Sequence, residues 1–395
     1  MAFHSDSRDA CLFILPWTLE GDGGVNQVGE NLMTQMDRHG EYRPLLLVNS
    51  WNDRSVREQN IKGHHHFFLR MNDLWNPERP LGGLLAFLLF LPLTLLKLVS
   101  LISVNKITVI NVHFCGLCAL NISVLRMFGL FKGRFILSFH GSDLLAAQRT
   151  IWPVRPLWKI LLGSADAIVT CSEHLKSEVV SFAPEISGKI ACIHNCIDVE
   201  SLGSAEKRLL PEGRPTRDYI LNVATFEPKK GQDVLVQAFA KICGKFPDLD
   251  LVLIGRPAGS YAALKNLIKT LGLGERIRLY ENVPHGEISA FFAAAMLFAL
   301  SSRYEPFGIV LLEAGFFATP VVATRVGGIP EIVTHGETGM LCDPDDVDGL
   351  ARELEFILGN PQERSRIGQN LRLHVLNNFT WDHAYAKYLK CLGGS

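Results

Sequence analysis

Short apolar segments alternate with segments of helical periodicity along nearly the whole chain. This alternation is typical of parallel βαβ units, and segments that are apolar throughout suit strands covered by helices on both faces. In the first half, the pattern predicts strands at residues 12–15, 45–48, 67–69, 108–112, 135–138, 167–170 and 189–193. In the second half, it predicts strands at residues 219–223, 249–254, 278–280, 296–300 and 320–323. We therefore expect an α/β protein.

A polar stretch rich in glycine, proline and basic residues separates the two sets of strands at residues 201–217. Such composition is typical of a linker between domains. We expect one domain over residues 1–205 and a second over 206–375. The length of 395 residues agrees with two domains, and a hydrophobic content of 48% excludes a disordered chain.

Net charge and cysteine content argue against some classes of protein. The net charge of −1 argues against a nucleic-acid-binding protein, and nine cysteines scattered through apolar segments are typical of reduced thiols in the cytoplasm. Cys115 and Cys118 form a C-x-x-C pair without a second pair to complete a zinc site. Three adjacent histidines at 64–66 stand before a predicted strand, where successive side chains alternate between faces, so we expect no metal there. The N-terminus lacks the features of a signal peptide.

Residues 81–104 form an apolar segment whose only charge is Lys97, with Pro92 near its middle. Two interpretations stay open: a helix buried against the sheet, or a helix whose outer face contacts a bilayer. A complete membrane span is disfavoured, because strands of one domain flank the segment on both sides and Pro92 would kink the helix. Basic residues near the apolar runs, such as Lys106 and Lys132, could meet anionic headgroups.

The most informative stretch for chemistry joins a predicted strand to a helix and contains Glu305 and Glu313. Backbone N–H groups of Phe307, Gly308 and Ile309 at the start of that helix would be unpaired, which suits a phosphate group. The two carboxylates would repel phosphate but accept hydrogen bonds from sugar or ribose hydroxyls. A surface loop with solvated glutamates is the alternative.

Other strand ends carry further candidates. Lys229 and Lys230 follow the strand at 219–223 and could neutralise a diphosphate. A glycine-rich loop with Gly23 and Gly24 follows the first strand, and His140 follows the strand at 135–138. Because ligands of open α/β sheets bind beyond the carboxyl ends of strands, these residues fit a binding site. A histidine packed in the core is the alternative for His140.

Taken together, these stretches resemble the retaining glycosyltransferases of family 4, which have the GT-B architecture of two Rossmann-like domains facing each other across a cleft. The matching residues occur in family order between about residues 11 and 385. They are Gly23 and Gly24, His140 to Asp143, residues 165–172, His194 to Asp198, Lys230 and Gly231, the E-x7-E pair Glu305 and Glu313, Gly327 to Glu331, and His335 to Gly339.

The resemblance implies a role for each candidate. Glu313 would hold the ribose of a nucleotide-sugar donor, and Glu305 with the N–H groups of Phe307, Gly308 and Ile309 would hold its sugar and diphosphate. Lys230 would neutralise the leaving diphosphate, His140 would lie by the donor sugar, and Gly23 and Gly24 would let the diphosphate approach the first domain. Residues 376–395, with Trp381, would form a helix that crosses back to the first domain.

The sequence departs from the family pattern at Thr225, where members usually carry an arginine that binds the diphosphate. Lys229 or another base would have to substitute. Cys196 and Ala318 replace common glycines, which we interpret as packing adjustments.

The implied reaction is hexosyl transfer with retention from a UDP- or GDP-linked sugar, without a metal or other cofactor. The acceptor would be a glycan or lipid-linked intermediate of polysaccharide or lipopolysaccharide biosynthesis, made in the cytoplasm or on the inner face of the cell membrane. Alternatives are a nucleotide-sugar epimerase on the same architecture and a non-catalytic, membrane-associated scaffold, for which Thr225 is the argument. A glycoside hydrolase is disfavoured, because hydrolysis needs no phosphate loop.

Overall fold

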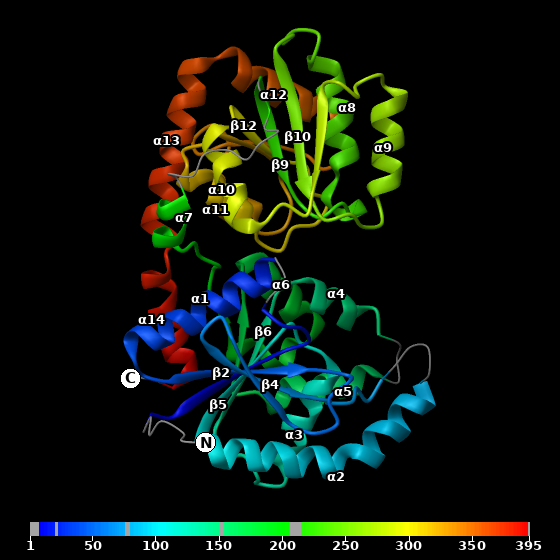
Figure 1. The fold of residues 1–395 in the computed structure, drawn as a ribbon, viewed down its shortest axis with the longest axis vertical. Helices are drawn as coiled ribbons and strands as arrows, with labels where there is room; N and C mark the ends of the chain where they lie inside the picture. Colours follow the sequence, from blue (N-terminus) through cyan, green and yellow to red (C-terminus); the bar gives the residue numbers. More distant parts are fainter. Residues whose placement is uncertain are drawn as a thin grey trace. The chain divides into compact units, whose positions relative to one another are not determined.

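The computed structural model describes residues 8–19, 23–75, 80–150, 154–205, 215 and 217–393. It divides into two compact units, residues 1–193 with 384–395 and residues 194–383 (Figure 1). The chain therefore passes from one unit to the other at Ile193 and returns at Ala384. Most of the linker predicted from composition, residues 206–214 and 216, lies outside the described residues.

Unit 1 contains an eight-stranded sheet in the order β3-β4-β2-β1-β5-β6-β7-β8, parallel except for β3. Its strands are β1 (Ala10–Leu15), β2 (Arg43–Asn49), β3 (Arg57–Ile61), β4 (His64–Leu69), β5 (Ile107–His113), β6 (Arg134–Phe139), β7 (Ala167–Thr170) and β8 (Ile190–Cys192). Its helices are α1 (Gly24–His39), α2 (Pro80–Asn105), α3 (Leu120–Met127), α4 (Ser142–Gln148), α5 (Arg155–Ser164) and α6 (Glu173–Phe182). The strands β1, β2 and β5 are almost wholly buried, as their apolar sequences predict.

Unit 2 contains a six-stranded parallel sheet in the order β11-β10-β9-β12-β13-β14. Its strands are β9 (Asp218–Val223), β10 (Leu249–Gly255), β11 (Ile277–Glu281), β12 (Leu297–Leu300), β13 (Val321–Thr324) and β14 (Met340–Cys342). Its helices are α7 (Val199–Ala205), α8 (Gln232–Ile242), α9 (Tyr261–Thr270), α10 (His285–Ala294), α11 (Ile309–Phe316), α12 (Val347–Gly359) and α13 (Pro361–Asn378). The prediction of two parallel α/β sheets is confirmed.

The last helix, α14 (Trp381–Leu392), begins in unit 2 and continues into unit 1. Within unit 1, the Tyr385 hydroxyl donates to a Glu41 carboxylate oxygen at 2.8 Å, and the Tyr385 ring stacks on His39 with centroids 4.6 Å apart. Tyr388 and Leu392 are also buried. The C-terminal segment is thus part of the core of the first unit.

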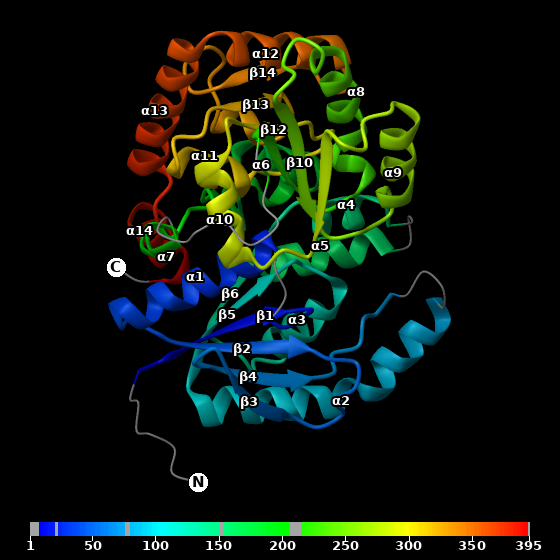
Figure 2. The same cartoon turned by 45° about the horizontal axis from the view of Figure 1, so that its top comes forward.

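The apolar segment forms the single helix α2, which connects β4 and β5 of one sheet. One side, with Phe87, Leu98 and Leu101, is buried. The other side exposes apolar residues at helical spacing, which include Leu81, Leu85, Leu88, Leu89, Leu93 and Leu96. Figures 1 and 2 show the bent axis of α2 along the outside of unit 1.

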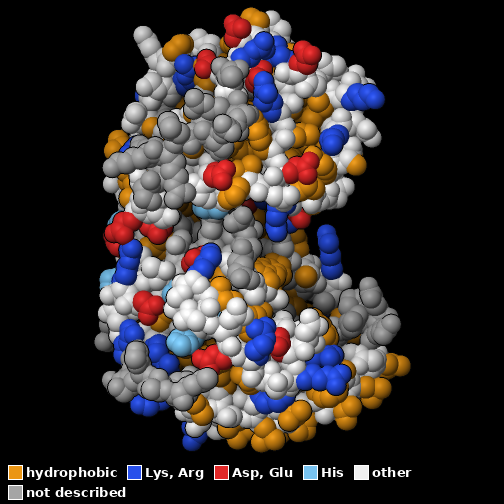
Figure 3. Space-filling model, in the orientation of Figure 1, with side chains coloured by type: hydrophobic (Ala, Val, Ile, Leu, Met, Phe, Trp, Pro, Cys, Tyr) orange, Lys and Arg blue, Asp and Glu red, His pale blue; other side chains and the backbone are white. Residues whose placement is uncertain are grey.

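Helix α2 is long and apolar enough to cross a membrane, and only 22% of its most apolar 18-residue stretch is buried. Burial against the sheet therefore accounts for one side of α2 alone. A helix that returns the chain to the same sheet cannot place its ends on opposite sides of a bilayer, so the topology excludes a span. Figure 3 shows the exposed hydrophobic side chains as a band along the region of α2.

The three adjacent histidines have different surroundings. His66 is fully buried, with its Nδ1 3.0 Å from the carbonyl of His64, whereas the exposed His65 lies 3.1 Å from a Glu58 oxygen. The strand geometry separates these side chains, and they form no common ligand set.

Candidate functional site

Glu305 lies in the loop between β12 and α11, and neighbouring loops hold its backbone in place. The N–H of Gly328 donates to the Glu305 carbonyl at 3.1 Å. A Cβ on Gly327, whose φ is 55°, would lie 1.8 Å from the same oxygen, so this position requires glycine. The loop after β13 therefore packs directly on the loop after β12.

The start of α11 offers backbone donors beside Glu305. Gly308 caps the helix with a φ of 104°, and Phe307 is buried. Within the described chain, no hydrogen bond uses the N–H groups of Phe307, Gly308 or Ile309. Three such donors at a helix start suit an anionic ligand, as the sequence predicts.

Lys230 and Glu305 form an ion pair. The Nζ of Lys230 lies 2.7 Å from Oε2 of Glu305, and their side chains are only 18% and 10% exposed. The turn before α8 brings Lys230 here, because a Cβ on Gly231 would lie 2.0 Å from the Ser301 carbonyl and the absence of a side chain lets the two loops touch. A diphosphate would compete with Glu305 for this cation, while the carboxylate would still accept sugar hydroxyls.

Glu313 lies on α11 and is nearly buried. Its Oε1 lies 2.9 Å from Nε2 of His285, which begins α10. Sequence reasoning missed His285; its only signal was its position between a predicted strand and a helical pattern. The pair orients the Glu313 carboxylate, and a carboxylate is a suitable acceptor for the hydroxyls of a ribose diol.

The basic residues near Thr225 differ in whether their side chains pair with carboxylates. Lys229 lies 2.9 Å from Glu227, and Arg303 donates to Asp233 and Asp345, hydrogen bonds that raise the pKa of Arg303. Arg256, at the end of β10, is exposed, and its carbonyl accepts from Phe226 N–H at 3.0 Å. Among the described residues, no carboxylate pairs with Arg256. The sequence reading did not single out this arginine beside the loop of Thr225.

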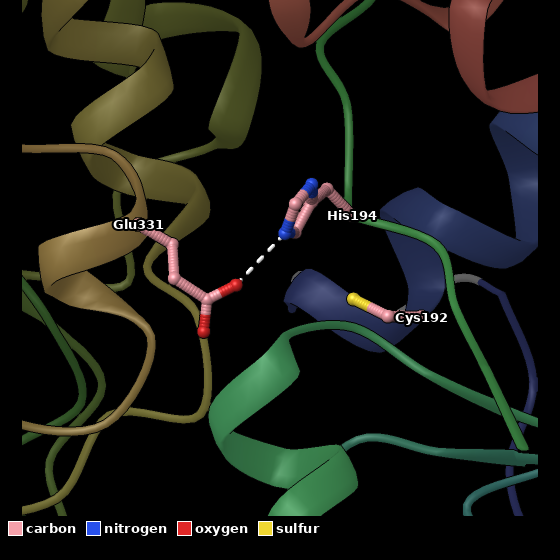
Figure 4. A group of neighbouring side chains, drawn as sticks. All are labelled: Cys192, His194 and Glu331. Carbon is pink, nitrogen blue, oxygen red and sulfur yellow. Dashed lines mark hydrogen bonds and ion pairs between the residues drawn. The ribbon is translucent and has the colours of Figure 1, made fainter.

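His194 and Glu331 form another pair in unit 2, with Nε2 and Oε2 2.8 Å apart (Figure 4). The imidazole stacks on Phe307, with centroids 5.5 Å apart, and Phe379 meets both rings edge-on. Cys192, also drawn in Figure 4, precedes His194 by two residues and belongs to unit 1. The aromatic contacts explain why Phe307 is buried although it begins a binding loop.

His140 follows β6 in unit 1, where its Nε2 lies 3.0 Å from Nδ1 of His113. Burial lowers the pKa of His140 to about 4, and burial together with His140 lowers the pKa of His113. Both imidazoles are therefore neutral at pH 7, and one N–H is shared between their facing nitrogens.

Asp143 holds the loop of His140. Its carboxylate accepts backbone N–H groups of His140 at 3.0 Å, Gly141 at 2.8 Å and Cys115 at 3.1 Å. Burial raises the pKa of Asp143 to about 6 in spite of these bonds. Asp143 thus fixes the position of both the His140 backbone and the start of the loop after β5.

Gly23 and Gly24 begin α1, and residues 20–22 of their loop lie outside the described residues. Gly23 has an extended φ of 166°, which any residue adopts. A Cβ there would meet no atom of the described residues within 4 Å, so this backbone position suits the close approach of a ligand. Nearby, Trp17 Nε1 donates to Asn26 Oδ1 at 2.6 Å and ties the loop to the helix.

The predicted residues thus form two groups. Unit 2 brings Lys230, Glu305 and the donors at the start of α11 together, with Glu313 one turn further along. Unit 1 carries His140, Gly23 and Gly24 at the carboxyl ends of its strands. Each group occupies the edge of a parallel sheet where ligands bind.

Two family models match the chain. The model described as "Glycosyltransferase Family 4" matches residues 22–201, and "Glycosyl transferases group 1" matches residues 208–374. Together they include all the candidate residues.

Curated relatives match part of their own length. A D-inositol 3-phosphate glycosyltransferase of Corynebacterium efficiens is 38% identical over 40% of this chain and 38% of its own length. A GDP-mannose-dependent alpha-(1-6)-phosphatidylinositol monomannoside mannosyltransferase of Mycolicibacterium smegmatis is 28% identical over 66% of this chain and 70% of its own. The chain therefore spans between about two fifths and seven tenths of these relatives.

Solved structures share the fold over nearly the whole chain. Sucrose-phosphate synthase of Thermosynechococcus elongatus has a TM-score of 0.79 at 21% identity, covering 97% of this chain and 98% of that one. Anabaena HepE in complex with UDP and glucose has a TM-score of 0.75 at 18% identity, covering 98% and 100%. These likenesses confirm the predicted GT-B fold.

Proposed function

Because the chain belongs to glycosyltransferase family 4, we propose that it transfers a hexose from a UDP- or GDP-linked donor with retention at the anomeric carbon. The observation that carries this proposal is the largely shielded pair of Lys230 and Glu305 beside the N–H groups of Phe307, Gly308 and Ile309, which make no hydrogen bond within the described chain. A cation and amide donors suit a diphosphate, and a carboxylate suits sugar hydroxyls.

In the proposed reaction, the bond between the anomeric carbon and the diphosphate oxygen breaks, and a bond to the acceptor oxygen forms on the same face. The proton of the acceptor hydroxyl passes to the departing diphosphate oxygen. Negative charge develops on the leaving diphosphate, and Lys230 with the N–H groups at the start of α11 stabilises it. These groups do so without a metal. Glu313 holds the ribose, in an orientation set by His285.

Unit 1 contributes His140, Gly23 and Gly24 to donor binding. His140 is neutral at pH 7, since burial lowers its pKa to about 4, so it offers hydrogen bonds to the hydroxyls of a neutral sugar. The open backbone at Gly23 leaves room for a phosphate. Asp143 supports this arrangement by holding the His140 loop.

Arg256 takes the place of the cation missing at Thr225. Its exposed side chain follows β10, and its backbone is hydrogen-bonded to Phe226 in the loop that carries Thr225. A guanidinium also binds phosphate bidentately, which Lys229 cannot do.

The acceptor proposed here is a lipid-linked or cell-surface glycan intermediate, and the protein works at the inner face of the cell membrane. The outward side of α2 supports this: Leu81, Leu85 and Leu89 are 75%, 68% and 74% exposed. A continuous apolar helix face of this kind suits the boundary between headgroups and acyl chains. The mycobacterial relative named for a phosphatidylinositol mannoside agrees with a lipid acceptor.

Donor kinetics test the site. Glu313→Ala should weaken nucleotide binding about tenfold or more, and Lys230→Ala should lower kcat by about 10²-fold, because it removes charge stabilisation from the transition state. Arg256→Gln, measured in the same assay, should raise the donor KM. Release of nucleoside diphosphate with and without acceptor is the readout.

Lys269→Gln, an exposed change on α9, is the control. Unchanged donor kinetics in both Glu313→Ala and Lys230→Ala would overturn the assignment. Conversion of the donor to another nucleotide sugar without release of nucleoside diphosphate would favour an epimerase, and absence of any nucleotide binding would favour a scaffold.

A further inference from the structure

A small hollow of about 60 Å³ lies in unit 1 between α2 and the segments that follow β2 and β4. Three basic residues contribute to its lining, and we call it the basic niche. Its lining residues are Arg54, Arg70, Asn72, Phe90, Leu93, Thr94 and Lys97. None of them belongs to the proposed donor site.

Contacts within the chain hold two of the cations at the niche. The Nζ of Lys97 donates to the carbonyl of Arg54. The Nε of Arg70 donates to Oδ1 of the buried Asn72 at 2.9 Å, and its guanidinium lies 4.9 Å from the ring centroid of Trp51. Arg70 and Lys97 are thus positioned from two different elements around one hollow.

No carboxylate neutralises this charge within the part of the chain that the structure describes. Asp53, the acidic neighbour of Arg54, lies 2.9 Å from Arg57 and accepts from Ser50, and these contacts lower its pKa. Three like charges around one hollow repel one another, and a bound anion would relieve that repulsion. The chemistry of the niche therefore fits a phosphate group.

The surroundings distinguish a lipid from a free anion. Phe90 and Leu93 line the niche and are themselves 39% and 50% exposed. They continue along the outward side of α2 to Leu89 and Leu96, which are also exposed. Figure 3 shows Lys and Arg side chains beside the hydrophobic band. The basic niche is therefore lined by cations and bordered by apolar side chains. This combination suits a molecule in which a phosphate is joined to a hydrocarbon chain.

We propose that the basic niche binds the phosphate of an acidic glycerophospholipid while the outward side of α2 contacts the acyl chains. This inference rests on the membrane contact in the proposed function and adds a defined headgroup site to it. The bound lipid would fix how deeply and at what angle α2 lies in the membrane surface, because the phosphate and the apolar side would be held at once.

A monomeric lipid tests the niche without a membrane. Dihexanoyl-phosphatidylglycerol, kept below its micelle concentration, is titrated into the full chain, with tryptophan fluorescence as readout because Trp51 contacts Arg70. Wild type should bind saturably, and Arg54→Gln/Lys97→Gln should bind at least tenfold more weakly. The control Lys106→Gln/Lys132→Gln removes two exposed charges outside the niche and should change binding less than twofold.

Inorganic phosphate in the same titration distinguishes a free-anion site. We expect it to need at least tenfold higher concentration than the lipid. Equal loss of binding in the two double variants, equal affinity for inorganic phosphate, or no binding of the lipid to wild type would each overturn the proposal.

Sedimentation with phosphatidylglycerol-containing vesicles separates the niche from the membrane contact as a whole. Leu85→Gln/Leu89→Gln should lose vesicle binding but keep the affinity for monomeric lipid. Niche variants that pellet as well as wild type would contradict the niche. Lipid binding without any vesicle binding of wild type would refute the membrane contact and leave the niche standing.

Discussion

At the scale of single residues, the site depends on ion pairs between residues that are far apart in the sequence. Lys230 and Glu305 stand 75 positions apart, and each was predicted to meet the donor. The structure shows that they neutralise each other at 2.7 Å. Since breaking a shielded pair by removing one partner leaves an uncompensated charge, either substitution affects stability as well as binding.

His140 provides a pH-dependent prediction. Burial lowers its pKa to about 4. The unfolded chain, with a histidine pKa of about 6.5, takes up the proton first as the pH falls, so the folded state loses stability between about pH 6.5 and 4. This group alone removes on the order of 2 kcal/mol by pH 5.

We therefore expect His140→Gln to lose less stability than wild type between pH 7.5 and 5. Urea denaturation at both pH values measures the difference. His65→Gln is the control, because His65 is exposed and its replacement should preserve the wild-type pH dependence. A variant at position 140 with the full wild-type loss would show that His140 does not titrate in this way.

At the scale of elements, apolar runs predicted the buried strands, and two of the observed strands were missed. β3 pairs antiparallel with β4 through a turn at Lys62 and Gly63, and four of its five residues are exposed. An exposed edge strand has no apolar pattern to detect. β14 has three residues and was not predicted, although β8 of the same length was.

The loop at Gly327 supplies a prediction at this scale. Gly327→Ala would place a Cβ within 1.8 Å of the Glu305 carbonyl at a φ of 55°, so the two loops must separate. We expect at least about 2 kcal/mol of destabilisation and a clear rise in donor KM. Thermal unfolding and donor kinetics measure both effects.

Gly274→Ala is the matched control, because a Cβ there meets no atom within 4 Å. It should leave stability and kinetics near wild type. If Gly327→Ala behaves like Gly274→Ala, the contact between the loops after β12 and β13 is not what positions Glu305.

At the scale of the whole molecule, the last residues stabilise the first unit. Tyr385, Tyr388 and Leu392 are at most 3% exposed, and Tyr385 bonds Glu41. Deleting residues 384–395 removes these side chains and exposes the part of unit 1 on which they pack. We therefore expect the free energy of unfolding of unit 1 to fall by at least about 4 kcal/mol. Denaturation followed by tryptophan fluorescence measures the loss.

Lys387→Ala, an exposed position on the same helix, should leave the transition unchanged. A truncated chain that unfolds at the wild-type denaturant concentration would show that α14 does not contribute to the stability of unit 1.

The sequence by itself determined the two α/β halves, most strands and the loops that carry Lys230, Glu305 and Glu313. Hydrophobic periodicity and turn residues depend on neighbours only a few positions away, so they can be recognised in the sequence itself. Only the tertiary structure decided that His285 contacts Glu313, that Arg256 stands beside Thr225, and that one side of α2 stays uncovered. These depend on which distant segments pack together, and packing is a property of three-dimensional neighbours.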